Sequence, residues 1–185
     1  PASGAGRGAI ACDSRHLSQT FAQITAEVLA ANGLEPWMDA ELRPTPQLAW
    51  TVRELGAVAG VVVTASHNPS IYNGYKVYAS DGGQVVAPED AQLVSEVRAL
   101  PPDAEVPRSP EGIHLLDASW DEGYRKLLTS FRLSEDLVQH GSDLPIAFTG
   151  LHGTGALAVP AALRAFGFRN VHEVASQAVR DGAFP

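Results

Sequence analysis

The stretch AVAGVVVTASHNPSIYNGYKVY, residues 57–78, decides the fold. Residues 57–64 are almost continuously apolar, which is typical of a central strand covered by helices on both faces of its sheet. The polar residues that follow at once are Thr64, Ser66, His67 and Asn68. Pro69 disfavours helical backbone at Asn68. The sequence therefore predicts a shaped polar loop at the carboxyl end of a buried strand, where open α/β sheets bind ligands.

Strands and helices alternate outward from this stretch. The pattern predicts strands at 9–12, 34–38 and 73–78, a short return strand at 84–86, and helices beginning at Ser18, Thr45 and Pro88. Gly33 and Gly56 are expected to end the first two helices, and Thr45 is expected to cap the second, with Pro46 at its first position. The hairpin after residue 73 makes the sheet mixed. The expected fold is a three-layer α/β/α arrangement with a mixed, mainly parallel sheet.

The pattern restarts in the last third of the chain. Residues 101–119 are rich in proline and acid and are expected to form an exposed connection before an amphipathic helix at 120–131. A strand at 144–150, a helix at 156–168 and a strand at 170–175 complete the expected elements. We expect a first domain over residues 1–140 and a truncated second α/β unit over residues 141–185.

Composition narrows the classes of partner. A net charge of −8 is a poor match for nucleic acid or an anionic membrane. No run of residues approaches the roughly 18 apolar positions of a membrane span, and no signal peptide opens the sequence, so we expect a cytoplasmic protein. Cys12 lies in an apolar stretch and is interpreted as a small buried hydrophobe. The three tryptophans are interpreted as packing residues.

Ser66 has several possible roles. It could present its hydroxyl to a ligand, or it could belong to a polar turn in which its side chain bonds nearby backbone. A serine hydrolase elbow requires flanking glycines, whereas Ala65 and His67 stand beside this serine. Lys76, on the following strand, is a candidate partner for a phosphate, or else a solvated lysine.

Two further residues have alternative readings. Arg43 precedes a helix and could attract an anion, or it could belong to a rigid helix start set by the neighbouring prolines. His152, in a glycine-containing loop, could face a cleft or be structural.

Several motifs together resemble one family. They are ACDSR at 11–15, TASHNP at 64–69, NGYKVY at 73–78, DGGQ at 81–84, LHGTG at 151–155 and DGAFP at 181–185. The set resembles the α-D-phosphohexomutase superfamily, the phosphoglucomutases and phosphomannomutases, over nearly the whole chain. TASHNP with a lysine ten residues after its serine is its most specific part. NGYKVY with DGGQ is more similar to the phosphoglucomutase and phosphopentomutase branch than to the phosphoglucosamine branch.

The resemblance implies a mechanism. Ser66 would be a phosphoserine that exchanges its phosphoryl group with a sugar monophosphate through a bound bisphosphate, with a sugar 1,6-bisphosphate as activator. A phosphoryl oxygen on Ser66 would ligate Mg²⁺, and Lys76 would neutralise phosphate or move a proton. His67 would support the site. Arg15 would either contact phosphate or hold the end of its strand through a salt bridge.

The chain also departs from the family pattern. It lacks the metal loop D-G-D-x-D-R and the third and fourth domains of the family. We therefore expect a fragment that has no turnover alone. The alternative is a catalytically silent domain of the same fold that serves as a binding module.

Overall fold

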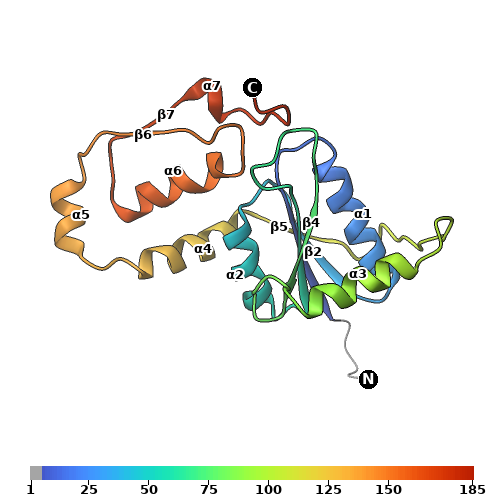
Figure 1. Cartoon of the computed structure of the whole chain (residues 1–185). Helices are drawn as coiled ribbons and strands as arrows, with labels where there is room; N and C mark the ends of the chain where they lie inside the picture. Colours follow the sequence, from blue (N-terminus) through green and yellow to red (C-terminus); the bar gives the residue numbers. More distant parts are fainter. Residues whose placement is uncertain (1–5) are drawn as a thin grey trace.

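The first unit of the chain is built around a five-stranded sheet (Figure 1). The computed structural model describes residues 6–185, except for the side chain of residue 137. The elements of this unit are β1 (Arg7–Cys12), α1 (Ser18–Ala31), β2 (Glu35–Asp39), α2 (Thr45–Leu55), β3 (Ala59–Val63), β4 (Tyr75–Ala79), α3 (Glu89–Ala99) and β5 (His114–Leu116). The strand order is β4-β3-β1-β2-β5, and only the β3–β4 pair is antiparallel. The predicted α/β fold with a mixed, mainly parallel sheet is confirmed.

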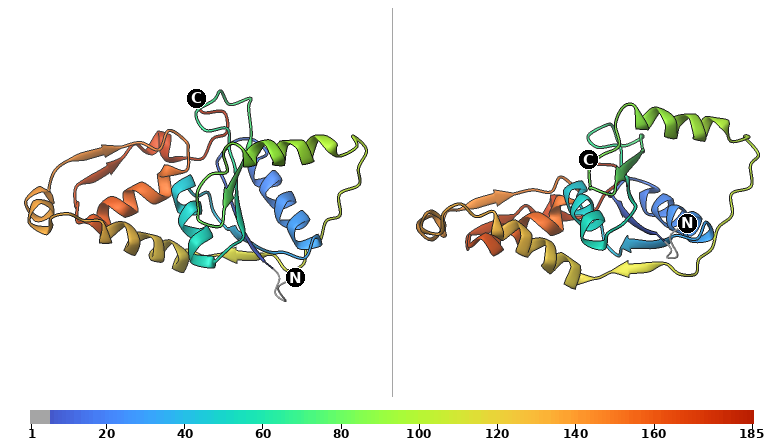
Figure 2. Two further views of the ribbon diagram at one scale, coloured as in Figure 1. Left: turned by 60° about the horizontal axis from the view of Figure 1, so that its bottom comes forward. Right: turned by 90° about the horizontal axis from the view of Figure 1, so that it is seen from below.

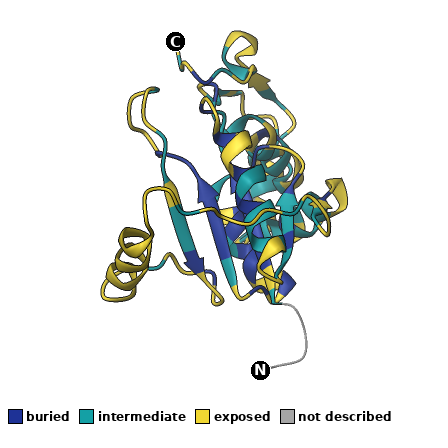
Figure 3. Cartoon of the chain, turned by 90° about the vertical axis from the view of Figure 1, so that its right-hand side faces the viewer, coloured by how far each residue is buried: buried dark blue, intermediate teal, exposed yellow. Residues whose placement is uncertain are grey.

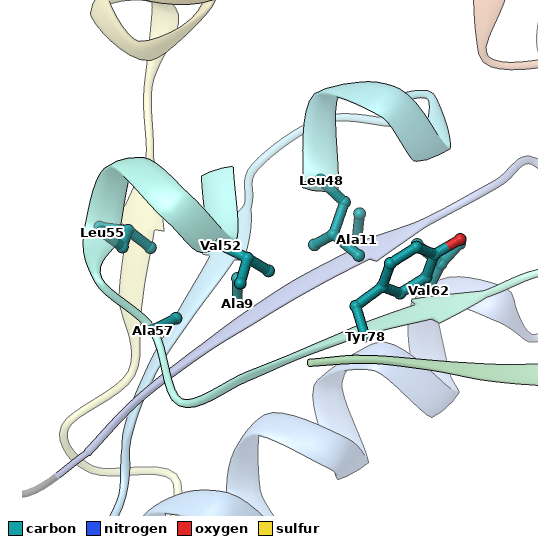
Figure 4. Close-up of a cluster of buried hydrophobic side chains, with 8 residues drawn as sticks. All are labelled: Ala9, Ala11, Leu48, Val52, Leu55, Ala57, Val62 and Tyr78. Atoms are coloured by element: carbon teal, nitrogen blue, oxygen red, sulfur yellow. The ribbon is translucent and has the colours of Figure 1, made fainter. Parts of the chain in front are cut away.

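Both faces of the central strands are buried, as the apolar run at 57–64 predicted. Val62 belongs to a cluster under α2 that also contains Leu48 and Val52 (Figure 4). Val61 and Val63 point to the opposite face, in a cluster with Ala22 and other residues of α1. Alternate side chains of one strand therefore fill two cores, which is the pattern of a sheet between two helical layers. Figure 3 shows this buried centre, whereas α3 is exposed along its whole length.

Three local predictions differ from the structure. The exposed connection contains β5, which pairs with β2 and places His114 in a stack on Trp37 with ring centroids 4.5 Å apart. A strand of three residues is too short to give a periodic signal, so sequence reasoning missed it. The return strand at 84–86 is reduced to a single bridge between Tyr78 and Gln84. Thr45 is the first helical residue and Pro44 takes the cap position, so Thr45 caps nothing.

The two predicted glycine stops are confirmed. Gly33 and Gly56 have φ values of 78° and 60°, in the left-handed region that glycine adopts at low cost. The connection before β5 runs around the outside of α1 (Figure 2), and Ser109 N–H donates to Glu27 O at 3.0 Å. An exposed connection is therefore correct for most of residues 101–113.

A second α/β unit follows, as predicted. Its elements are α4 (Ala118–Ser130), α5 (Glu135–Gly141), β6 (Ile146–Phe148), α6 (Gly155–Phe166), β7 (Val171–Glu173) and α7 (Ala175–Ala178). Strands β6 and β7 form a two-stranded parallel sheet, and α6 packs against α4. The predicted boundary between residues 140 and 141 lies inside α5 and remains a prediction. In the described range, no helix is both long and apolar enough to cross a membrane.

Candidate functional site

The candidate site lies where β1 and β3 end side by side. The chain leaves β1 toward β2 on one side, while β3 lies on the other side, so this pair is the point at which the strand order switches direction. Ligands of open α/β sheets bind outside the carboxyl ends of such strands. Two segments meet there: the turn at 13–16 after β1, and the loop at 64–74 after β3, which we call the serine loop.

Arg15 holds the backbone of the serine loop. Its side chain is only 2% exposed. Its guanidinium donates four hydrogen bonds of 2.6–2.9 Å to the backbone carbonyls of Ser66, Asn68, Pro69 and Tyr72. Its Nε lies 3.2 Å from Asp13 Oδ2. Two roles were left open for Arg15, a contact to phosphate and a structural salt bridge. The geometry favours the structural role, because Arg15 binds Asp13 and also four backbone carbonyls of the serine loop.

Asp13 links the same loop to β1. Its Oδ2 accepts a hydrogen bond of 2.6 Å from Thr64 Oγ1, which in turn accepts one of 2.9 Å from the backbone N–H of Ser66. Its Oδ1 accepts bonds from Ser18 Oγ and from the backbone N–H of Arg15. One carboxylate, whose side chain is 12% exposed, therefore fixes both segments. Sequence reasoning missed Asp13 as a site residue, although it lies in the quoted ACDSR motif.

Asn73 fixes the far end of the serine loop. Its amide nitrogen donates to Ser18 Oγ at 2.9 Å and to His16 O at 3.1 Å. Its Oδ1 accepts from the N–H of Gly74. A Cβ on Gly74 would lie 2.8 Å from Thr64 O, so the close approach of the two loop ends requires glycine. Asn73 was also missed as a site residue, although it opens the quoted NGYKVY motif.

Ser66 itself is exposed and has an unusual backbone conformation. Its φ of 58° places a residue other than glycine in the left-handed region. This conformation costs on the order of 1 kcal/mol, and the hydrogen bonds to its backbone N–H and C=O offset that cost. Ser66 is thus an exposed residue on a turn whose backbone is held by hydrogen bonds on both sides.

The remaining predicted site residues lie near this turn but are not joined to it by hydrogen bonds. His67 is exposed beside Ser66. Lys76 is half-buried and stands opposite Val62 in the β3–β4 register, close to the strand end that carries the loop. In the described part of the chain, no hydrogen bond joins Ser66, His67 and Lys76 to one another.

Arg43 and His152, for which the sequence left two interpretations open, are both buried and bound to other parts of the chain. Arg43 is buried and forms a bidentate pair with Asp121, with both N–O distances 2.6 Å. His152 is also buried, and its Nδ1 lies 2.8 Å from Val179 O. A carbonyl only accepts, so this nitrogen of His152 carries the proton.

Cys12 is buried, as predicted. The pKa of its thiol is raised to about 11, chiefly by burial and also by the nearby carboxylates of Asp13 and Asp39. A protonated, enclosed thiol is a poor nucleophile. This supports the interpretation of Cys12 as a small core residue.

The residues present do not fit a magnesium site by themselves. Among residues 6–185, no group of three or more His, Cys, Asp or Glu side chains is placed to hold a metal ion. Asp13, which is hydrogen-bonded to Thr64 of the serine loop, already accepts hydrogen bonds at both oxygens. Mg²⁺ takes several oxygen ligands in near-octahedral geometry, and one serine oxygen does not supply them.

The sequence of the first unit matches a family model. Residues 2–102 match domain I, the alpha/beta/alpha domain, of the phosphoglucomutase/phosphomannomutase family. The chain belongs to the phosphoglucomutase/phosphomannomutase family. The fold, the serine loop and the motif set all agree with that membership.

Curated phosphoglucomutases are similar to this chain over both units. A phosphoglucomutase from Staphylococcus epidermidis is 40% identical over 180 residues, which cover 93% of this chain and 32% of that protein. A phosphoglucomutase from Staphylococcus aureus is 36% identical and is covered to 31%. The chain thus spans about a third of the length of these relatives.

Solved structures agree in fold. A Thermus thermophilus protein assigned as a phosphomannomutase superposes with a TM-score of 0.83 at 27% identity. The match covers 98% of this chain and 39% of that one. A phosphoglucomutase/phosphomannomutase family protein from Burkholderia thailandensis superposes with a TM-score of 0.73 at 21% identity, which supports the fold alone.

Proposed function

We propose that this chain carries the phosphoserine of an intramolecular phosphotransferase that interconverts sugar 1-phosphates and 6-phosphates. Ser66 is the phosphoryl carrier, and the proposed domain boundary between residues 140 and 141 lies inside α5. The observation that carries the proposal is the exposed Ser66 on a turn whose backbone is fixed by the buried Arg15 and, through Thr64, by Asp13. A phosphoryl carrier needs an accessible oxygen in a fixed position, because phosphoryl transfer depends mainly on alignment and charge neutralisation.

The proposed loading step balances in atoms and charge. Ser66 Oγ forms a bond to the phosphorus of a sugar 1,6-bisphosphate, and the bond from that phosphorus to the sugar oxygen breaks. The proton of the serine hydroxyl ends on the released sugar oxygen, which leaves a sugar monophosphate. In turnover, phosphorylated Ser66 transfers its phosphoryl group to the free hydroxyl of a sugar monophosphate, which forms the bisphosphate and returns the hydroxyl proton to Ser66 Oγ. The phosphoryl group at the other end of that bisphosphate then passes to Ser66 by the loading step, and the isomeric monophosphate is released.

Lys76 and His67 have supporting roles in this proposal. Lys76 neutralises phosphate as a compact cation, or moves the serine proton, and His67 borders the reacting group. Mg²⁺ as cofactor and a sugar 1,6-bisphosphate as activator remain part of the proposal. Metal ligands other than Ser66 would come from residues outside this chain. A cytoplasmic location fits a substrate that is a free sugar phosphate.

Phosphopeptide mass mapping tests the proposal directly. The native protein is isolated from its source cells and mapped before and after incubation with an unlabelled hexose monophosphate. We expect phosphate on Ser66 before incubation and its transfer to the sugar afterwards. Ser66→Ala should abolish the modification, whereas Ser70→Ala, which changes another serine of the same loop, should retain it.

The alternative is a catalytically silent domain that binds a partner. It predicts that Ser66 stays unmodified even when a hexose bisphosphate and Mg²⁺ are supplied together. That outcome would overturn the phosphoserine proposal. Modification of Ser70 in place of Ser66 would also overturn it, because Arg15 also binds the carbonyls of Pro69 and Tyr72, on either side of Ser70, and a fixed backbone would then not single out Ser66.

A further inference from the structure

A segment of the second unit covers the base of the serine loop. We call residues 177–184 the strap. In Figure 1 the chain passes from α7 across the top of the first unit to its C-terminal end. The ring of Phe184 lies over the Arg15 guanidinium, with its centroid 5.1 Å from Cζ. The other contacts of this guanidinium are with loop carbonyls and Asp13, so the ring completes its enclosure.

Gly182 lets the strap approach the 13–16 turn closely. A Cβ at this position would lie 2.8 Å from His16 N and 2.9 Å from Ser14 O, both backbone atoms. Distances under 3.0 Å require a shift, and backbone atoms cannot move aside as a flexible side chain can. Glycine is therefore needed at residue 182 for space, and any side chain there would lift the strap from the turn.

The strap has further anchors on both units. His152 holds it from the second unit, through Nδ1 to Val179 O and through its N–H to Gln177 O at 3.0 Å. Ser14 Oγ donates to His152 O at 2.7 Å, which ties this loop to the 13–16 turn. Arg180 pairs with Glu41, which follows β2. The strap is thus held at several points around Arg15.

We propose that the strap positions Ser66 through Arg15, and that Phe184 is a positioning residue for the phosphoryl carrier. A cation over an aromatic face is stabilised most when water is excluded from it. Removal of the ring admits water to the guanidinium, which competes with the carbonyls of the serine loop for its N–H groups. The loop then moves more freely, and Ser66 loses its fixed position. The effect on phosphoryl acceptance rests on the function proposed above; the effect on loop motion does not.

Hydrogen exchange read by mass spectrometry tests the effect on motion in the full 185-residue chain. The reporters are the amides of Asn68 and Tyr72, which bond to Ala65 O and Pro69 O inside the serine loop. Phe184→Leu should speed exchange of peptides covering residues 64–74 by about tenfold, the equivalent of losing a desolvated cation–π contact. Phe184→Tyr keeps the ring face and should restore slow exchange.

A matched control exists on the far side of the second unit. Phe166 covers Arg132 with a ring centroid 5.9 Å from its Cζ. Phe166→Leu removes the same kind of contact and should leave exchange at residues 64–74 unchanged. Gly182→Ala lifts the strap without touching Phe184 and should speed exchange as Phe184→Leu does. If Gly182→Ala does not fold, Phe184→Leu and Phe184→Tyr still decide the outcome.

The two proposals fail in distinguishable ways. Unchanged loop exchange in folded Phe184→Leu would overturn the strap proposal, whatever the state of Ser66. Equal acceleration by Phe166→Leu would also overturn it, because the effect would then be general loosening. If exchange responds as expected but Ser66 of the native protein is never phosphorylated, the strap positions the loop and the phosphoserine proposal fails. If both hold, Phe184→Leu should slow Ser66 phosphorylation by about tenfold and Phe184→Tyr should restore it.

Discussion

Two arginine–aspartate pairs in this molecule share one geometry and differ in burial. Arg43 binds Asp121 through Nε and a terminal nitrogen, and Arg169 binds Asp143 in the same bidentate way. The side chains of the first pair are 8% and 22% exposed, and those of the second are 70% and 77% exposed. The second pair remains hydrated, so its attraction is screened by water and salt. Bidentate geometry alone therefore does not show how much an ion pair contributes to the stability of the fold.

The same contrast separates the two units. The first unit has two buried clusters on opposite faces of its sheet. Within residues 141–185, the buried residues are His152, Pro160 and Gly182. His152 and Gly182 face the first unit, through Ser14 and the 13–16 turn. The second unit thus gains much of its burial from contact with the first, and its stability should respond to that contact more than to its own interior.

The largest expected effect concerns Asp39, at the end of β2 near the Arg43–Asp121 pair. The pKa of Asp39 is raised to about 7, chiefly by burial; the Arg43 guanidinium opposes this shift and the Asp121 carboxylate adds to it. In the described part of the chain, Asp39 Oδ2 is buried and has no hydrogen-bond partner. The folded state therefore binds this proton more tightly than the unfolded state, whose pKa is 3.8. Stability should fall as the pH rises from about 4 to about 7, and remain low above 7.

Asp39→Asn removes this titration. The pKa difference corresponds to at most about 4 kcal/mol, so the variant should be more stable than the wild type at pH 8 and similar to it at pH 4. Urea unfolding at a series of pH values measures the difference. Asp143→Asn makes the same substitution at the exposed pair and serves as the matched control. If the unfolding free energy of the wild type does not fall relative to that of Asp39→Asn between pH 5 and pH 7, the raised pKa of Asp39 is wrong.

The second prediction compares the cores of the two units. Leu48 of α2 is fully buried, whereas Leu163 of α6 is half-buried. Leu48→Ala should cost about 3 kcal/mol in unfolding free energy, because it removes apolar contacts and leaves a cavity. Leu163→Ala should cost about 1 kcal/mol, because water already reaches part of that side chain. Equal losses in chemical unfolding would show that the second unit has a core of its own.

The third prediction tests the two ion pairs against each other. Asp121→Ala leaves the buried Arg43 guanidinium without its carboxylate and also removes the acceptor of Gln47 Nε2, which lies 2.7 Å from Asp121 Oδ1. We expect a loss of about 2 kcal/mol, somewhat below that of a fully enclosed pair because Asp121 is 22% exposed. Asp143→Ala should not move the unfolding midpoint measurably. A comparable shift in both variants would mean that geometry outweighs burial.

The sequence predicted the strands and helices that carry the site better than the hydrogen bonds and ion pairs within it. The run at 57–64 is apolar on both faces of its strand, so it could only be central, and Ser66 was correctly placed just beyond its end. Gly33 and Gly56 ended their helices because a left-handed residue is needed there. These features depend on local pattern and backbone geometry, which a sequence displays directly.

The roles of Arg15, Asp13 and Asn73 depend on contacts between segments far apart in the chain. Arg15 lies 51 residues from Ser66, whose carbonyl it binds. A charged residue at a strand end gives no sign of whether its partner is a phosphate or a set of carbonyls. The strap is hidden for the same reason, since Phe184 meets Arg15 only after two units have folded. Sequence reasoning missed the short strand β5 because its position depends on packing against Trp37 and not on a local sequence preference.

The smallest expected effect concerns the hydrogen bond that joins α4 to α2. Trp120 Nε1 donates to Thr51 Oγ1 at 3.0 Å, and Thr51 is fully buried. Trp120→Phe keeps an aromatic ring near Trp50, whose ring centroid lies 5.3 Å from that of Trp120. It should cost about 1 kcal/mol through the lost bond. A double-mutant cycle with Thr51→Val isolates this term from the change in ring size.

A coupling of about 1 kcal/mol would mean that the first turn of α4 is fastened to α2 by Trp120 as well as by Asp121. The second unit would then be held to the first at two separate places, along α4 and through the strap over Arg15. A coupling near zero would leave Asp121 and the strap as the main attachments. Loosening of the strap should in that case spread further through the second unit, and Gly182→Ala should speed hydrogen exchange in α6 as well as in the serine loop.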